Sequence, residues 1–370
     1  MLKAALIGCG VIAPTHAKAL LLDGRATVAW ACDHDVVKAR VRIPQAAQFT
    51  ADYRQALADP SVDVVCICTP HADHAEPLAA AVAAGKHVIC EKPLGVIPGQ
   101  VEQMVVTAAR GEENGLVMVG IFQHRFNPLI ARLKVLLDAG DFGRIEAASM
   151  DFRCTRADSY YSAGAWRGTW TGEGGALLIN QAIHTIDAVN WLCGEPLAVA
   201  GTVERRRLDS IECEDHAVFS VQYRGGHRGT FAAANDGTSG WVTDITVRCE
   251  RGSFSLGKGA YALTALDHPS AVIRADINGH DRLRDAILPV DDSGSKAEYG
   301  DFHALQIADA LSAIIAGRSP RFRIADAATS VQVVLGVYHS SATGGNDIAL
   351  PVCGYTHPVF TPAPPVHFRK

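Results

Sequence analysis

The stretch that decides the fold is Lys3-Ala-Ala-Leu-Ile-Gly8-Cys-Gly10-Val-Ile-Ala13. Residues 3–7 are apolar and predict a buried strand, and a helical pattern follows over residues 14–22. Between them lies G-x-G-x-x-A. Its first glycine permits a tight turn, the second lets the backbone approach a pyrophosphate, and the alanine lets helix and strand pack closely. Because a helix start attracts anions, we predict a dinucleotide-binding turn formed by Gly8, Gly10, Val11 and Ile12.

The second predicted strand, residues 27–32, ends in Asp33. This residue lies about 20 positions beyond the glycines, where a carboxylate accepts hydrogen bonds from the ribose diol of an adenosine. The same carboxylate repels a 2′-phosphate, and the next residues, His34-Asp35-Val36, offer no arginine to hold one. The sequence therefore predicts NAD rather than NADP as the cofactor. A role of Asp33 as the N-cap of the next helix is compatible with this one.

The rest of the first 122 residues alternates between strands and helices. Apolar runs at residues 62–68, 87–90 and 117–121 follow helical patterns at 53–58, 72–84 and 98–110. Strands that are apolar throughout indicate a parallel sheet covered on both faces. We predict that residues 1–122 form an NAD-binding α/β Rossmann domain with a doubly wound parallel sheet.

Ligands of such sheets bind at the carboxyl ends of the strands. Four residues after the strand at 62–68 are therefore predicted to contact the cofactor: Thr69, Pro70, His71 and His74. The two histidines fit equally well as polar groups facing the cofactor and as residues that start the next helix. They have no acid or cysteine at metal-ligand spacing, so we predict no metal.

Glu91-Lys92-Pro93 follows the strand predicted at residues 87–90. It places Lys92 at the carboxyl end of a buried strand, and a lysine in a desolvated cleft can lose its proton and act as a base. The alternative is a surface lysine after a strand that Pro93 ends. Taken together with His184, the pattern favours a catalytic Lys92, with Glu91 and Lys92 also contributing to the cofactor site.

Composition changes from about residue 123. A helix is predicted at 128–138, then strands separated by glycine-rich turns at 145–153, 197–203, 217–223, 229–234, 242–249 and 252–256, and a late helix at 302–316. This order predicts that residues 123–370 form an α+β domain with a large open, mainly antiparallel sheet. The Pro-rich tail after Pro351 is predicted to be an extended surface arm.

A helix predicted from Ala176 carries Asn180 and His184, which share a face because they are four residues apart. His184 can exchange a proton near neutral pH, and we predict both residues as catalytic and substrate-binding. The alternative is a core histidine on an amphipathic helix, which the glycine pair before the helix makes less favourable. Further substrate-side candidates are Arg125, Tyr161, Trp166, Arg167 and His303; the aromatic and arginine residues suit a sugar ring.

The composition excludes several classes of function. The chain has 370 residues, 48% of them hydrophobic, and a net charge of −5 with no long basic run, so we expect no nucleic-acid partner. It contains no apolar stretch of about 18 residues, so we expect no membrane partner. The strand at Lys3 leaves no apolar core for a signal peptide, and the ten cysteines show no metal or disulfide pattern. We therefore expect a cytoplasmic protein with reduced thiols.

In combination, these motifs resemble the Gfo/Idh/MocA family of oxidoreductases. The resemblance rests on the glycine turn at residues 8–13, Thr69-Pro70, His74, the block 85–93 with Glu91-Lys92-Pro93, residues 123–126, the block 174–187 with His184, and residues 313–318 and 340–344. It implies a Rossmann domain followed by an open-sheet domain through which the chains form homodimers or homotetramers. It also implies hydride transfer between a nicotinamide and a secondary hydroxyl of a sugar or cyclitol.

Carried over by residue, Lys92 and His184 match the catalytic lysine and histidine of the family. Asn180 departs from the pattern, because many family members have aspartate there, and this leaves the division of proton transfer between Lys92 and His184 open. The form of residues 160–184 resembles a subgroup that oxidises pyranose rings. Two alternatives remain: a redox-neutral, NAD-dependent glycosidase, and a non-catalytic nicotinamide-sensing regulator, which would need neither Lys92 nor His184. The sequence does not name the sugar, the oxidised carbon or the direction.

Overall fold

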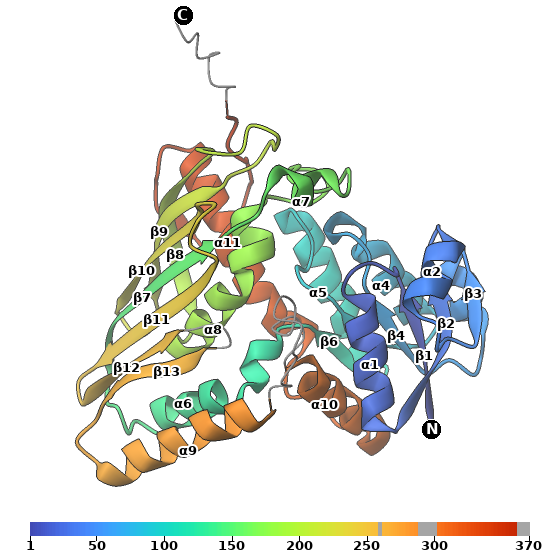
Figure 1. The fold of residues 1–370 in the computed structure, drawn as a ribbon, viewed down its shortest axis with the longest axis horizontal. Coiled ribbons are helices and arrows are strands. Elements are labelled where there is room, and N and C mark those ends of the chain that lie inside the picture. Colours follow the sequence, from blue (N-terminus) through green and yellow to red (C-terminus); the bar gives the residue numbers. More distant parts are fainter. Residues whose placement is uncertain (258–260, 288–301, 361–370) are drawn as a thin grey trace, which may run out of the picture. The chain divides into compact units, whose positions relative to one another are not determined.

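The computed structural model describes residues 1–257, 261–287 and 302–360, drawn in colour in Figure 1. It divides into two compact units. The first consists of Met1–Asp141 and Ser270–Val331, and the second of Phe142–Pro269 and Gln332–Lys370. Both units contain residues from beyond position 122, where the sequence analysis places the domain boundary. That boundary remains a prediction.

The first unit contains a six-stranded parallel sheet in the order β3-β2-β1-β4-β5-β6. The strands are β1 Leu2–Ile7, β2 Ala26–Cys32, β3 Gln48–Thr50, β4 Val64–Ile67, β5 His87–Cys90 and β6 Met118–Gly120. The predicted Rossmann sheet is confirmed. Of the six strands of this sheet, β3 was the one not predicted, because three residues are too few to show a periodic pattern. Strand order reverses between β1 and β4, and ligands of open α/β sheets bind at such a reversal.

Helices of the first unit agree with the predicted pattern and add to it. They are α1 Ala13–Asp23, α2 Val36–Arg42, α3 Tyr53–Ala58, α4 Ala75–Ala83, α5 Pro98–Glu113, α6 Pro128–Asp138, α9 Ala271–Ile287 and α10 His303–Ala316, with 3₁₀ turns at His71–Asp73 and Gln123–Phe126. The late helix α10 packs on α1, and its Ile307 and Leu311 share a core with Leu20. Residues from beyond position 300 therefore complete the sheet's cover.

The second unit contains an eight-stranded sheet in the order β13-β12-β11-β7-β10-β9-β8-β14. The strands are β7 Ile145–Cys154, β8 Pro196–Glu204, β9 His216–Tyr223, β10 Arg228–Asn235, β11 Trp241–Cys249, β12 Gly252–Gly257, β13 Ala262–Asp267 and β14 Ile348–Ala349. Adjacent strands are antiparallel except β7 and β10. The predicted mainly antiparallel sheet is thus confirmed, and alternating burial along β9 shows that one face is covered.

Helices cover that face of the second sheet (Figure 1). They are a π-helix Leu177–Ala182, α8 Ile183–Cys193 and the end of α11 Ile324–Ala342, whereas the short helix α7 Asp158–Ser162 follows β7. Helix α8 packs on β7 and β11, and Gly336 of α11 lies against Val199 of β8. Helix α11 was not predicted, because its β-branched run Val-Gln-Val-Val (331–334) disguises the helical period.

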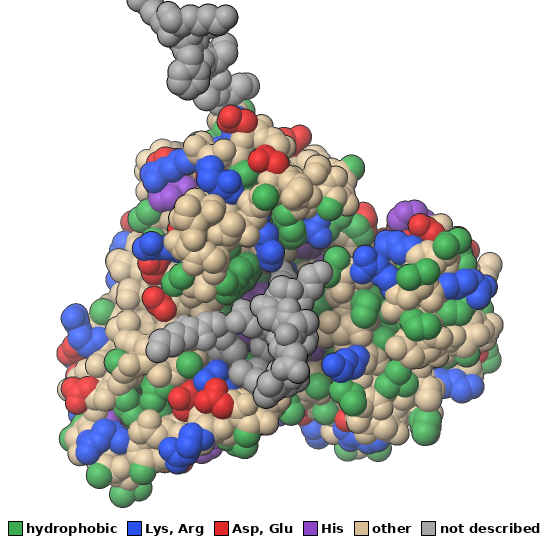
Figure 2. All heavy atoms as spheres, viewed as in Figure 1, with side chains coloured by type: hydrophobic (Ala, Val, Ile, Leu, Met, Phe, Trp, Pro, Cys, Tyr) green, Lys and Arg blue, Asp and Glu red, His purple; other side chains and the backbone are tan. Residues whose placement is uncertain are grey.

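The predicted surface arm is in part packed. Residues 352–360 contain no helix or strand, but His357 stacks on Trp170 at 4.8 Å between ring centroids. Residues 361–370 lie outside the described part. No helix among the described residues is long and apolar enough to cross a membrane. On the face drawn in Figure 2, acidic, hydrophobic and uncharged side chains separate the basic ones.

Candidate functional site

The glycine turn after β1 requires glycine at position 8. Gly8 has φ +86°, and a Cβ atom there would lie 2.7 Å from the backbone of Cys68 and Thr69, which follow β4. The Gly8 N–H donates to the carbonyl of Cys32, at the end of β2 (2.8 Å). The turn is therefore packed tightly between the ends of the two strands that flank β1.

This turn has the free backbone groups that a pyrophosphate needs. The N–H groups of Val11 and Ile12 donate to no described residue, and no side chain caps the N-terminus of α1. A Cβ atom at Gly10 would meet no atom closer than 3.9 Å. Unpaired N–H groups at a helix start attract anions. The residues present therefore fit the diphosphate of a dinucleotide.

Asp33 is fixed at the end of β2 as a carboxylate. Its oxygens accept hydrogen bonds from the N–H groups of Cys9 (2.8 Å) and Asp35 (3.0 Å) and from Lys38 Nζ (3.0 Å). Burial favours the neutral acid, but these donors outweigh it and lower the Asp33 pKa. Lys38 was not among the predicted site residues. A second cation, Arg42, lies near the glycine turn, with its Nη1 3.4 Å from the Gly10 carbonyl.

His74 connects the segments after β4 and β5. Its Nε2 lies 3.0 Å from the Thr69 carbonyl and its Nδ1 lies 2.8 Å from the Pro93 carbonyl. The ring is fully buried, and burial lowers the pKa of His74. His71 is also buried, with its ring centroid 6.3 Å from that of His74. We interpret His74 as a link between these segments; its contact with the cofactor remains a prediction.

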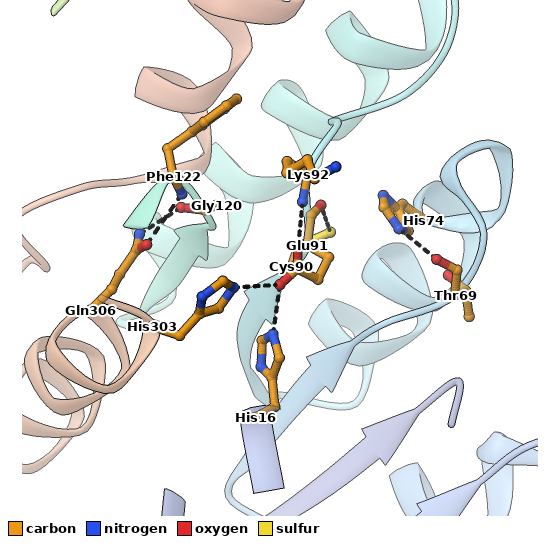
Figure 3. A network of polar contacts seen from close by, with 10 residues as sticks. All are labelled: His16, Thr69, His74, Cys90, Glu91, Lys92, Gly120, Phe122, His303 and Gln306. Carbon is orange, nitrogen blue, oxygen red and sulfur yellow. Dashed lines mark hydrogen bonds and ion pairs between the residues drawn. The ribbon is translucent and has the colours of Figure 1, made fainter. Parts of the chain in front are cut away.

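Glu91 lies at the centre of a buried network, drawn in Figure 3. Its Oε1 faces His16 Nε2 of α1 at 2.7 Å and His303 Nε2 of α10 at 3.2 Å. Its Oε2 accepts the backbone N–H of Lys92 at 3.1 Å. All three charged or titratable side chains of the network are at most 5% exposed. The network therefore fixes the backbone from which the Lys92 side chain projects.

The network is best described as a buried ion pair. Burial favours neutral forms of both partners, but the hydrogen bonds from His16 and His303 lower the Glu91 pKa well below its ordinary value. Burial alone lowers the His16 pKa, yet neighbouring thiols and Glu91 raise it well above the ordinary value. Among the described residues, His16, Glu91 and His303 are also the group whose side chains are of the types that bind metal ions. However, both imidazole nitrogens hydrogen-bond directly to the same carboxylate oxygen, Glu91 Oε1, rather than facing a space between the three side chains.

Glu91→Gln is expected to destabilise the protein by about 3–5 kcal/mol, because it leaves a buried His16 cation without its partner. The loss should shrink as the pH falls below the ordinary carboxyl pKa of 4.5, since a carboxyl with a lowered folded pKa gives its full stabilisation above its ordinary pKa and loses it progressively as the pH falls through the folded pKa. Urea unfolding at several pH values measures it. The control is Glu76→Gln at an exposed ion pair with Arg54, expected to cost less than about 1 kcal/mol. Equal losses would contradict the buried ion pair.

Three residues predicted as catalytic or substrate-binding lie in the first unit. Lys92 is half-buried directly after β5. The Arg125 guanidinium carbon lies 4.1 Å above the centre of the Phe322 ring. His303, predicted to face the substrate, is instead 2% exposed and bonded to Glu91. We therefore interpret His303 as a positioning residue for Glu91.

In the second unit, the segment predicted as an α-helix from Ala176 begins as a π-helix, Leu177–Ala182. A buried carboxylate holds its start: Glu214 accepts the N–H groups of Ala176 (3.2 Å) and Leu178 (2.8 Å) and the hydroxyl of Tyr338 (2.7 Å). Burial raises the pKa of Glu214 to about 7. π-Helical turns are frequent at functional sites, and this one carries Asn180.

The side chain of Asn180, which stands where many family members have aspartate, contacts the carboxyl group of another residue. Its Nδ2 donates to Glu173 Oε1 and, at 3.1 Å, to the hydroxyl of Tyr160. Glu173 is fully buried, and its other oxygen accepts the N–H of Gly168. A carboxyl group of the kind that many family members place at position 180 therefore lies beside that position, but it comes from position 173.

The remaining predicted residues lie around the same segment. His184, in the first turn of α8, is half-buried. The Arg167 guanidinium carbon lies 4.8 Å above the Trp166 ring centre and 4.2 Å above that of Tyr160. Tyr161 is 4% exposed, and its hydroxyl has no described hydrogen-bond partner. The tyrosine that contacts Asn180 is the neighbouring Tyr160, and the role of Tyr161 as a substrate-side residue stays a prediction.

Comparisons with known proteins agree with this description. The model of the oxidoreductase family with an NAD-binding Rossmann fold matches residues 2–121, and that of the GFO/IDH/MocA C-terminal domain matches residues 130–255. Inositol 2-dehydrogenase 2 of Paenarthrobacter aurescens is 25% identical over 353 residues, 92% of this chain and 97% of that protein. Levoglucosan dehydrogenase of Pseudarthrobacter phenanthrenivorans is 35% identical over 154 residues, 40% of this chain and 38% of that protein.

A solved structure has the same fold. The WlbA dehydrogenase from Bordetella pertussis, in complex with NADH and UDP-GlcNAcA, superposes with a TM-score of 0.84 at 24% identity, over 95% of this chain and 98% of that one. The family models match the whole first sheet and strands β7–β11 of the second. This chain belongs to the GFO/IDH/MocA family of NAD-binding oxidoreductases.

Proposed function

We propose that this chain is an NAD-dependent dehydrogenase that oxidises a secondary hydroxyl of a sugar, a sugar derivative or a cyclitol. The observation that carries the proposal is the position of Lys92. It stands at the carboxyl end of β5, and its backbone is bonded to a carboxylate that two buried histidines hold. A sensor of nicotinamide would need no such lysine. The inositol and levoglucosan dehydrogenases among its relatives support this class of substrate.

In the proposed mechanism, the chain supplies binding, orientation and proton transfer. NAD, when bound, supplies the hydride acceptor. Val11 and Ile12 N–H groups hold the diphosphate and Asp33 the ribose diol. Lys92 or His184 takes the hydroxyl proton, which contributes roughly 10²–10⁴-fold to rate in such reactions.

Substrate recognition is proposed for the second unit. Asn180 orients the substrate beside His184, with the buried carboxyl group of Glu173 behind the amide. Trp166 and Arg167 offer an apolar ring and a cation to the sugar.

Asp33→Asn is expected to lower the ratio of kcat/KM with NAD to that with NADP by at least about tenfold. The reason is twofold: the charge that repels a 2′-phosphate is lost, and Lys38, now bonded to Asp33, becomes available to the phosphate. Initial rates with the two cofactors measure the ratio. The control is Asp52→Asn, which changes the N-cap of α3 and should leave the ratio unchanged. An unchanged ratio in Asp33→Asn would refute the specificity role.

The proposal is tested by mixing the pure protein with NAD or NADP and with myo-inositol, levoglucosan, other free sugars, glycosides and UDP-sugars. Formation of reduced nicotinamide with one class supports the dehydrogenase and names its substrate group. Substrate conversion without net NADH would support the redox-neutral glycosidase instead. Tight NAD binding with no conversion at all would support the sensor.

We further propose a cytoplasmic homodimer or homotetramer joined through the outer face of the second sheet. In the described residues all cysteines are free thiols, nine of them buried, which suits a reducing compartment. The uncovered positions of β9 and β10 include Val218 and Ala232, small apolar side chains that a second chain could cover. Light scattering of the pure protein gives the mass and tests the assembly.

A further inference from the structure

The second unit holds a tyrosine hydroxyl that receives two hydrogen bonds and gives none. The side-chain amide nitrogens of Asn180 and Gln181 lie 3.1 and 3.0 Å from Tyr160 Oη. Tyr160 lies in α7 and is half-buried. Tyr160 was not among the predicted substrate-side residues.

Neighbouring groups fix the orientation of both amides. Gln181 Oε1 accepts from Arg156 Nε at 3.2 Å, and because a guanidinium can only donate, the Gln181 NH₂ group must face Tyr160. Asn180 Nδ2 donates to Glu173, whose other oxygen accepts a backbone N–H. The second hydrogen of the Asn180 NH₂ group is then directed at Tyr160. Both amides therefore donate to the phenolic oxygen.

A phenolic oxygen accepts with its lone pairs and donates one hydrogen. Since two donors occupy the oxygen of Tyr160, its hydrogen must point elsewhere, and it reaches no acceptor among residues 1–257, 261–287 and 302–360. The ring itself is held in place, with the guanidinium carbons of Arg156 and Arg167 4.7 and 4.2 Å from its centre. The result is a positioned donor whose hydrogen is not used by any residue that the structure describes.

We propose that Tyr160 is a substrate-binding residue whose hydroxyl donates a hydrogen bond to an oxygen atom of the sugar or cyclitol. This inference rests on the proposed function. Because the amides allow Tyr160 only to donate, the group selects a substrate oxygen that can accept, and we assign this oxygen to a hydroxyl of the substrate. Its contact with Asn180, which lies four residues before His184, places this recognition on the segment that carries the predicted proton-transferring histidine.

The test is Tyr160→Phe, assayed with the panel compound that the wild type oxidises best and with the monodeoxy analogues of that compound. We expect kcat/KM for the parent compound to fall roughly tenfold or more, with the Kd for NAD unchanged. One deoxy analogue should show the same fall with the wild type and no additional fall with Tyr160→Phe. A purely structural role would lower kcat/KM by the same factor for every analogue.

Tyr223→Phe is the matched control. It also removes a hydroxyl bonded to an amide, since Tyr223 Oη lies 2.6 Å from Asn190 Oδ1 in the core. It should lower the Tm without changing kcat/KM. Unchanged kcat/KM in Tyr160→Phe, or equal losses across all analogues, would overturn the inference while leaving the proposed function intact. A wild type that oxidises no compound of the panel would overturn both.

Discussion

Lys92→Ala is expected to lower kcat by about 10²–10⁴-fold while changing the Kd for NAD by less than about threefold. The reason is that the lysine is proposed to carry the proton of the substrate hydroxyl, a role worth this factor, whereas the groups proposed to hold the diphosphate and ribose lie in the turn after β1 and at the end of β2. Steady-state kinetics and a fluorescence titration with NADH measure the two quantities.

Two further variants sharpen this prediction. Lys92→Arg keeps the positive charge but cannot release its proton at physiological pH, so it should be nearly as inactive as the alanine variant. Lys18→Ala changes an exposed lysine of α1 and should retain full activity. A Lys92→Ala protein with more than about a tenth of wild-type kcat would contradict the role of Lys92.

Gly8→Ala is expected to destabilise the protein by at least about 2 kcal/mol and to weaken NAD binding severely. A side chain at φ +86° costs roughly 1–2 kcal/mol, and its Cβ would also meet the backbone of Cys68 and Thr69 at 2.7 Å. Backbone cannot yield as the end of a flexible side chain can, so the turn must move away from β4. Urea unfolding and NADH titration measure the two effects.

Gly24→Ala provides the matched control. Gly24 ends α1 with φ +78°, and a Cβ atom there would meet nothing within 4 Å. It should therefore show the conformational cost alone, about 1–2 kcal/mol, with NAD binding unchanged. If Gly8→Ala and Gly24→Ala were equally stable and bound NAD equally well, the close packing of the glycine turn would be refuted.

Features coded by residues close in sequence were predictable. The glycine turn and Asp33 belong to one strand–helix–strand segment, and their chemistry follows from spacing. Lys92 could likewise be placed at the end of a strand from the apolar run before it. Strand β3 could not, because three residues show no period. Helix α9 was not predicted either: its apolar residues recur at helical spacing, but its sequence is polar overall.

Contacts between distant residues were not predictable. His16 and His303 lie 75 and 212 residues from Glu91 in the sequence, and both contact it. The local sequence around each residue gives no sign of its two partners. The backbone N–H groups at the start of the π-helix Leu177–Ala182 donate to Glu214, which lies more than 30 residues further along the chain. The choice between Tyr160 and Tyr161 likewise depends on which side of a short helix faces Asn180. Such features appear only once the fold brings the partners together.

The central claim is that the chain transfers a hydride from a secondary carbinol to NAD. The most direct measurement uses a substrate from the panel carrying deuterium at the carbinol carbon, with mass analysis of both products. We expect one equivalent of deuterated NADH for each equivalent of ketone. Conversion of the substrate with no net NADH, or NADH without deuterium, would contradict it.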